Sequence, residues 1–298
     1  MRKSLATGLA ALAVAAVAPP AQAAAATSAR TTAATSARTT GDASAQAAAG
    51  TYWHSRTLQV MTHPRQVGSG GDKYWVVERR LSETWSSRDG RSWTAFRRLG
   101  AQPKSAADRA AWKRDGSPKK WSYRTEGMLV KLSLEPEKGS LTADKGSPGF
   151  ILGNTKLTFQ ELQDAPADPE GLKTWLQKLY STPGQPARDM RESHNIYTNL
   201  MEQYPVPKGV REAAYKLLST SSGVGVQDAG KGRKKVTYRS QDAKYKVRHS
   251  WVIDTNAMLL VSTDLDTVYQ GKQLLAKTWT MDIESGWTDK EPAVPAAP

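Results

Sequence analysis

Cysteine is absent from the 298 residues of the chain. Its absence excludes disulfide bonds, thiol catalysis and the lipid-modified cysteine that tethers some exported proteins to a membrane. The folded part must therefore be stabilised by its core alone, and the chain is long enough to build such a core as one domain or two small ones.

Histidine is scarce, with His54, His63, His194 and His249 as its only occurrences, and no two of them have the spacing of zinc ligands on a helix. His249 stands among apolar residues of a strand-like segment, so we predict a packed, hydrogen-bonded core histidine. The chain also lacks a G-x-S-x-G elbow and glycine-rich phosphate loops. We expect no catalytic residues, no metal and no cofactor, and a secreted hydrolase remains only a third alternative.

Long apolar runs are missing after the first residues. The chain begins with Arg2 and Lys3, continues with an apolar run from Leu5 to Ala18, and then reads Ala21-Gln22-Ala23. This pattern is typical of a secretory signal peptide, and the run is short for a membrane span. We expect residues 1–23 to be removed and the protein to be secreted; an uncleaved anchor is the alternative.

Large apolar residues are almost absent from residues 24–49, where the hexapeptide TSARTT occurs twice. Such a segment buries too little surface to offset chain entropy, so it is predicted to be a disordered Ala/Thr/Ser-rich spacer. A single domain is expected over residues 50–288, followed by a disordered tail over 289–298.

Basic residues exceed acidic ones, which gives a formal net charge of +14. A positive protein associates readily with anions, and outside the cell these are lipid head groups and wall polymers rather than nucleic acid. The charge does not indicate the oligomeric state.

Alternation of apolar and polar residues predicts strands in both thirds that flank the middle of the domain. The N-terminal segments are TYWHSRTLQV, KYWVVERRLSETWSS and RSWTAFRRL, the last two joined by a turn at Asp89-Gly90. MLVKLSL is a further short strand between two long loops, 100–127 and 135–150. The C-terminal segments are RKKVTYRS, KYKVRHSWVID, AMLLVSTDL and QLLAKTWTMDIESGW.

Helical periodicity is confined to the middle of the chain. One helix is predicted to begin at Pro169, with Asp168 as its cap. Two further helices are predicted over about 189–204 and about 207–219. Strands, helices and strands in this order predict an α+β fold, with a curved, mostly antiparallel, incomplete-barrel-like sheet and about three helices on one face.

The apolar faces of the predicted strands form one candidate site, in which the curved sheet leaves a slot for an apolar or lipid-like ligand. An ordinary filled core is the alternative. The candidate lining residues are Trp75, Val77, Leu81, Trp85, Tyr245, Val247, Trp251, Trp279 and Met281.

The basic faces form a second candidate, a positive patch that binds an anionic envelope polymer. A solvated sheet face is the alternative, because lysine is common on exposed strands. The candidate residues are Lys235, Arg239, Lys244, Lys246 and Arg248. The loop WKRDGSPKKWSYR, with aromatic residues among cations, is open to the same two interpretations.

Several segments together resemble an uncharacterised actinobacterial family of exported or membrane-anchored proteins. They are ETWSSRDG, WKRDGSP, LQDAPADPEGLKTWL, VREAAYKLLSTSSGV, VQDAGKGR and WVIDTNAMLL, spread over residues 51–264. The chain departs from the family's DPxTGxLL with DTNAMLL and from its LPGV with SSGV, so no residue role is carried over. The order of elements is also similar to the lipoprotein-carrier incomplete barrel, which implies an apolar cavity under helices and no catalysis.

Overall fold

The computed structural model describes residues 50–63, 65–125, 127–181, 193–241, 243–273 and 278–296. The predicted signal peptide and spacer lie outside these residues. Every described residue belongs to one compact unit, Gln46–Pro298.

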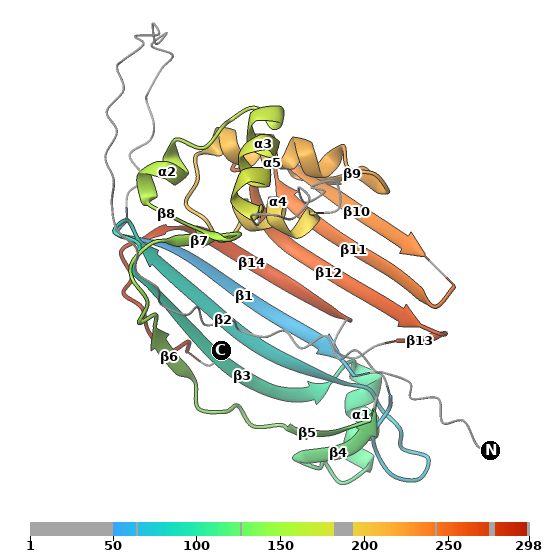
Figure 1. Ribbon diagram of the computed structural model, residues 1–298. Coiled ribbons are helices and arrows are strands. Elements are labelled where there is room, and N and C mark those ends of the chain that lie inside the picture. The colour runs from blue at the N-terminus through green and yellow to red at the C-terminus, as the bar shows by residue number, and fades with distance from the viewer. Residues whose placement is uncertain are drawn as a thin grey trace, which may run out of the picture. The chain divides into compact units, whose positions relative to one another are not determined.

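An antiparallel ten-stranded sheet dominates this unit and is curved but not closed (Figure 1). Nine strands follow the order β6-β3-β2-β1-β14-β12-β11-β10-β9, and β13 pairs with β12. Their bounds are β1 Tyr52–Thr62, β2 Val76–Ser87, β3 Ser92–Pro103, β6 Ser140–Ala143, β9 Val224–Gly230, β10 Arg233–Gln241, β11 Tyr245–Asp254, β12 Leu259–Tyr269, β13 Lys272–Gln273 and β14 Trp279–Thr288. The predicted curved antiparallel sheet is confirmed.

The first and last long strands join the two predicted groups of strands. β1 pairs with β14 over ten residues, from Tyr52 opposite Thr288 to Met61 opposite Trp279. On the far side of β14, Ser262 to Leu265 of β12 continue the sheet. The N-terminal and C-terminal groups therefore share one continuous surface.

The helices number five in the described residues, where the sequence predicted about three. They are α1 Ala106–Arg114, α2 Phe159–Gln163, α3 Pro169–Tyr180, α4 His194–Leu200 and α5 Lys208–Ser219. α1 and α2 were missed because α2 has only five residues and α1 lies in a segment interpreted as loop. No helix in the described residues combines the length and apolarity needed to cross a bilayer.

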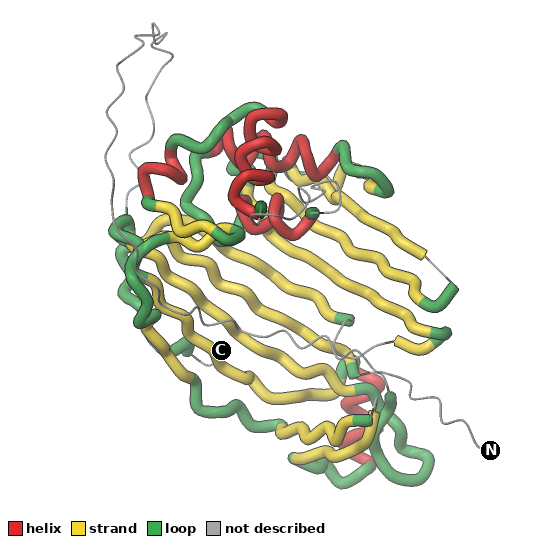
Figure 2. Tube along the Cα trace, in the orientation of Figure 1, coloured by secondary structure: helices red, strands yellow, loops and turns green. Residues whose placement is uncertain are grey.

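Helices α2 to α5 gather over the half of the sheet that contains β9 to β14 (Figure 2). Leu172 and Leu176 of α3 are fully buried, and the same cluster contains Trp251, Ile253 and Ile283 from the strands. This is the principal core, and its sheet side is the inner face of the sheet. Residues paired across the strands share a face, so Thr57, Ser82, Thr263 and Met281 also belong to the inner face.

Local signals explain the helix start that the sequence predicted best. Asp168 accepts a hydrogen bond from the backbone N–H of Gly171 at 2.7 Å, and Pro169 occupies the first helical position. The predicted start of the second helix falls among residues outside the described set; α4 itself ends at Leu200, before a turn.

Two short hairpins stand apart from the large sheet: β4 Lys120–Thr125 with β5 Met128–Ser133, and β7 Phe150–Leu152 with β8 Thr155–Leu157. β4 lies in the segment 100–127 that was predicted as a basic loop, and β5 coincides with the predicted short strand MLVKLSL. Trp121 and Leu132 anchor this first hairpin in a second, smaller core.

The segment 289–296, predicted to be part of a disordered tail, lies without regular secondary structure against β3. Arg97 Nη1 donates to the carbonyl oxygen of Pro295 at 2.8 Å, and Pro295 is buried. Val294 lies over Gly139, where no larger residue would fit without a shift.

Candidate functional site: a cavity on the inner face

A cavity of about 440 Å³ lies on the inner face, bounded by residues of β1 to β3, β11, β12, β14 and α4. This volume falls in the range of small-molecule sites. Beyond the cavity, toward β9, the helices cover the same face and fill it with core residues. The sheet concavity is therefore filled in one half and open in the other.

One wall of the cavity is aromatic. The rings of His249 and Trp251 lie 4.1 Å apart between centroids, and the ring of Trp279 meets His249 edge-on at 5.8 Å. Met281 continues this wall along β14. Such a surface offers flat apolar contact area with little conformational entropy to lose.

His249 is held neutral at pH 7. Burial, and then the neighbouring His194, lower its pKa to about 4. Thr263 donates its hydroxyl proton to the carbonyl oxygen of Ser250 at 2.9 Å, so it accepts from His249 Nε2 at 3.0 Å. This assigns the imidazole proton to Nε2 and confirms the predicted hydrogen-bonded histidine.

The opposite wall is polar. Small hydroxyl and amide side chains alternate along the inner face of β1 and β2: Ser55, Thr57, Gln59, Ser82 and Thr84. Asn195 and Asn199 of α4 add amides above them. The cavity thus presents apolar contact on one side and hydrogen-bonding groups on the other.

Glu202 stands at the polar wall, two residues beyond the end of α4. From the described residues, its carboxylate accepts only long hydrogen bonds, from Ser55 Oγ at 3.4 Å and Thr57 Oγ1 at 3.5 Å. Burial raises its pKa above the ordinary value. The backbone is fixed by Trp53, whose Nε1 donates to the carbonyl oxygen of Glu202 at 2.9 Å. A carboxyl group so weakly paired is available to a hydrogen-bond donor of a ligand.

The predicted apolar lining is divided by the strand register. Trp251, Trp279 and Met281 do lie at the cavity. Tyr245 and Val247 share their face of β11 but lie beyond the cavity, and Tyr245 packs on Tyr269 with centroids 4.7 Å apart.

The remaining predicted lining residues do not reach the cavity. Ser82 pairs with Thr57 on the inner face, so Val77, Leu81 and Trp85 alternate onto the opposite, outer face. Trp75 precedes β2. Leu81 and Trp85 are nevertheless 1% and 3% exposed, so their apolarity reflects burial on the outer side. The sequence showed the alternation, but not which face of this strand turns inward.

The predicted basic patch assembles on the outer face of β10 and β11. Arg239 lies directly opposite Arg248, and Gln241 opposite Lys246. Acidic residues of β12 reduce its charge: Arg248 is 3.5 Å from Asp264, and Lys235 is 3.8 Å from the same carboxylate. Lys244 directly precedes β11 at the end of the patch.

Sequence reasoning missed the polar wall, including Glu202 and Arg80. The available signal was the row of small polar residues in HSRTLQ and LSETW, at alternate positions of two neighbouring strands. Such a row on a face that turns inward has no role in an apolar core.

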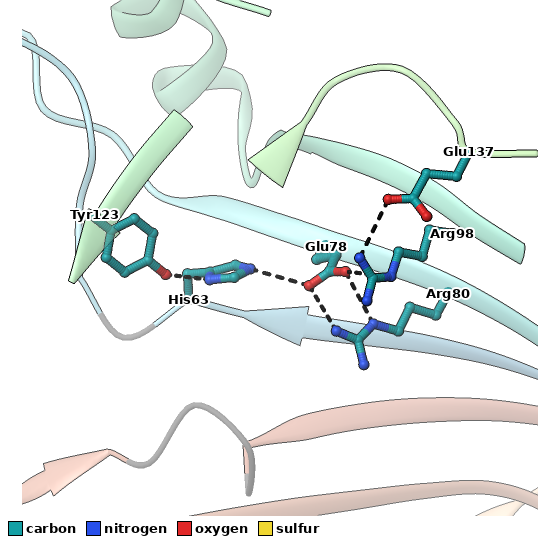
Figure 3. Close-up of polar contacts among 6 residues, drawn as sticks. All are labelled: His63, Glu78, Arg80, Arg98, Tyr123 and Glu137. Atoms are coloured by element: carbon teal, nitrogen blue, oxygen red, sulfur yellow. Dashed lines mark hydrogen bonds and ion pairs between the residues drawn. The ribbon is translucent and has the colours of Figure 1, made fainter. Parts of the chain in front are cut away.

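A second polar cluster lies near the start of β2, next to the cavity (Figure 3). Arg80, which lines the cavity, donates to Glu78 from Nε at 3.0 Å and from Nη2 at 3.2 Å. His63 lies between Glu78, 3.7 Å away, and the hydroxyl of Tyr123 on β4. His63 is 1% exposed, and its contacts on either side connect the β4–β5 hairpin to the sheet.

The described residues contain no group of three or more His, Asp or Glu that could hold a metal ion. No protein-family model matches the sequence, and no curated protein matches it. Among solved structures, a mutant form of the Rh. blastica porin aligns with 73% of this chain and 68% of its own, at 10% identity and a TM-score of 0.12. A score this low carries no argument about fold or function.

Proposed function

We propose that the protein is a secreted, non-enzymatic binding protein that holds an amphiphilic, lipid-like molecule of the cell envelope in the inner-face cavity. The observation that carries the proposal is the division of this cavity into an aromatic wall and a hydroxyl-rich wall. The apolar part of the ligand contacts Trp251, Trp279 and Met281. Its polar part hydrogen-bonds to the side chains of β1 and β2 and to Glu202.

Polar wall residues refine the ligand class. A bare hydrocarbon would leave the Glu202 carboxyl with only its long hydrogen bonds from Ser55 and Thr57 among the described residues, at a cost in free energy. A ligand with both an apolar and a hydroxylated or amide-bearing part satisfies both walls. The neutral His249 adds a ring face and no charge.

The test is native mass spectrometry of protein purified from its own secreting cells, followed by solvent extraction of whatever co-purifies. We expect a stoichiometric amphiphile. Ser82→Trp, which fills the cavity from the inner face of β2, should abolish its retention. Thr280→Trp, on the outer face of β14, is the matched control and should retain it.

Two results would reject the proposal: an apo mass with no uptake from envelope lipid extracts, or equal retention by Ser82→Trp and the wild type. If Ser82→Trp fails to give a cooperative melting transition, Met281→Ala replaces it, because that change removes apolar contact without adding bulk.

The outer-face patch supports a second candidate, binding of an anionic wall polymer. Arg239 facing Arg248 favours it, and the neighbouring Asp264 and Asp266 oppose it. Pull-down with isolated wall polymer, compared for wild type and Arg239→Glu, tests this candidate separately from the cavity.

A further inference from the structure

Two large apolar residues at the tip of the β4–β5 hairpin are exposed and consecutive in sequence. They are the only such pair in the described residues. Met128 is 48% exposed and Leu129 is 50% exposed, and both follow the turn at the tip. The other exposed apolar residues, such as Ile151 and Val226, stand singly. Adjacent exposed apolar residues mark interaction surfaces more often than scattered ones do.

The hairpin base is fixed, so the tip is presented at a defined place. Trp121 and Leu132 pair with each other and are buried, and Trp121 Nε1 donates to the hydroxyl of Tyr74 at 2.9 Å. The hairpin does not join the ten-stranded sheet and lies at one end of it, beside α1 (Figure 1).

Cations surround Leu129 on one face of the hairpin. Leu129 lies opposite Arg124, and Lys131 and Lys120 share its face because they occupy alternate positions. All three are exposed, and none forms an ion pair with a residue in the described part of the chain. Arg65 lies beside them, donating to the carbonyl oxygen of Arg124 at 3.2 Å. The sequence between the two strands adds a single acid, Glu126.

We propose that this hairpin tip docks the protein on an anionic lipid bilayer, with Met128 and Leu129 entering the boundary between head groups and acyl chains. Apolar residues flanked by cations are the pattern of segments that lie in the interface of anionic membranes. An anionic polymer would use the cations and leave the apolar pair in water. Only an anionic bilayer offers contacts both to the cations and to the apolar pair, so we infer a bilayer rather than a polymer as the partner.

The test is flotation of the chain from Ala24 onward with vesicles of phosphatidylglycerol and phosphatidylcholine, compared with phosphatidylcholine alone. Binding is expected only to the anionic vesicles. Leu129→Ser should weaken the partition coefficient about tenfold, and Arg124→Glu with Lys131→Glu should weaken it more strongly. The matched controls are Val226→Ser, at an exposed valine, and Lys178→Glu with Lys216→Glu, at exposed cations of α3 and α5.

Insertion itself is measured with a thiol-reactive dye. Because the chain has no cysteine, the dye labels only a cysteine introduced by substitution. An environment-sensitive thiol dye on Leu129→Cys should shift its emission to the blue with anionic vesicles, while the same dye on Ile151→Cys should not. Equal flotation of wild type and Leu129→Ser overturns the proposal. So does charge-dependent flotation with no emission shift at position 129, which would indicate surface adsorption alone.

Discussion

Glu78 holds Arg80 with two hydrogen bonds, and this pair lies where the cavity ends and the second polar cluster begins. Burial alone would raise the pKa of Glu78, but His63 and Arg80 outweigh it and lower the pKa to about 2. The His63 distance of 3.7 Å is long for a hydrogen bond, so Arg80 is the direct partner.

Acid should therefore weaken the fold through Glu78. Its folded pKa lies below the unfolded value, so its contribution is present above about pH 4.5 and is lost as the pH falls toward 2. The contribution is on the order of 3 kcal/mol. Chemical unfolding of wild type and Glu78→Gln across this window should show a difference that shrinks with acid. A difference independent of pH would contradict the assignment.

His249 should titrate near pH 4, because burial and His194 lower its pKa. The unfolded chain binds this proton near pH 6.5, so the contribution of His249 is complete above that pH and declines as the pH falls to about 4. NMR titration of the imidazole measures the midpoint directly. His249→Gln should remove the corresponding part of the pH dependence of unfolding, and a midpoint above about pH 6 would refute the buried environment.

Trp251 connects the filled half of the inner face to the cavity, being 1% exposed in the core and also part of the aromatic wall. Trp251→Ala should lower the free energy of unfolding by about 3 to 5 kcal/mol. Val226→Ala, at a valine that is 41% exposed, should change it by less than about 0.5 kcal/mol. Urea unfolding of both variants measures the contrast, and similar losses would argue against this core.

The cap of α3 offers a local test. Asp168→Ala should cost about 1 kcal/mol, because the N–H of Gly171 loses its partner. Asp168→Asn keeps a side-chain oxygen and should recover most of the stability. If both variants melt at the same temperature, the cap hydrogen bond does not stabilise the helix.

Salt should distinguish the cavity from the two cationic surfaces, the outer-face patch and the hairpin tip. Ligand retained in the cavity rests on apolar burial and short-range hydrogen bonds, so a roughly tenfold rise in salt should leave retention unchanged. Polymer or vesicle binding through exposed cations should fall. Loss of the cavity ligand in salt would mean that an exposed charge contact holds it.

Local features of this fold could be predicted from the sequence. The period of two located the long strands, and Asp168, Pro169 and the buried leucines located α3. Pairing between distant strands could not be predicted in this way, because alternation shows that a strand has two faces but not which neighbour it meets. The β1–β14 pairing joins residues more than two hundred positions apart.

That missing information explains the division of the candidate site. Both faces of β2 are partly buried, so the apolar residues Leu81 and Trp85 indicated burial but not the inner face. The polar row with Ser82 and Thr84 turned inward instead. Trp251 lies on the inner face, where helices with apolar stripes cover its half of the sheet.

The position of β14 between β1 and β12 has a consequence for biogenesis. Until residues 279–288 are available, β1 has no partner on its second side, and neither does the stretch of β12 that pairs with β14. The sheet then remains in two parts with unpaired edges, the state most prone to wrong association. The two parts can join only once this last strand has been synthesised, so the sheet is completed late, after the chain has been made through Thr288.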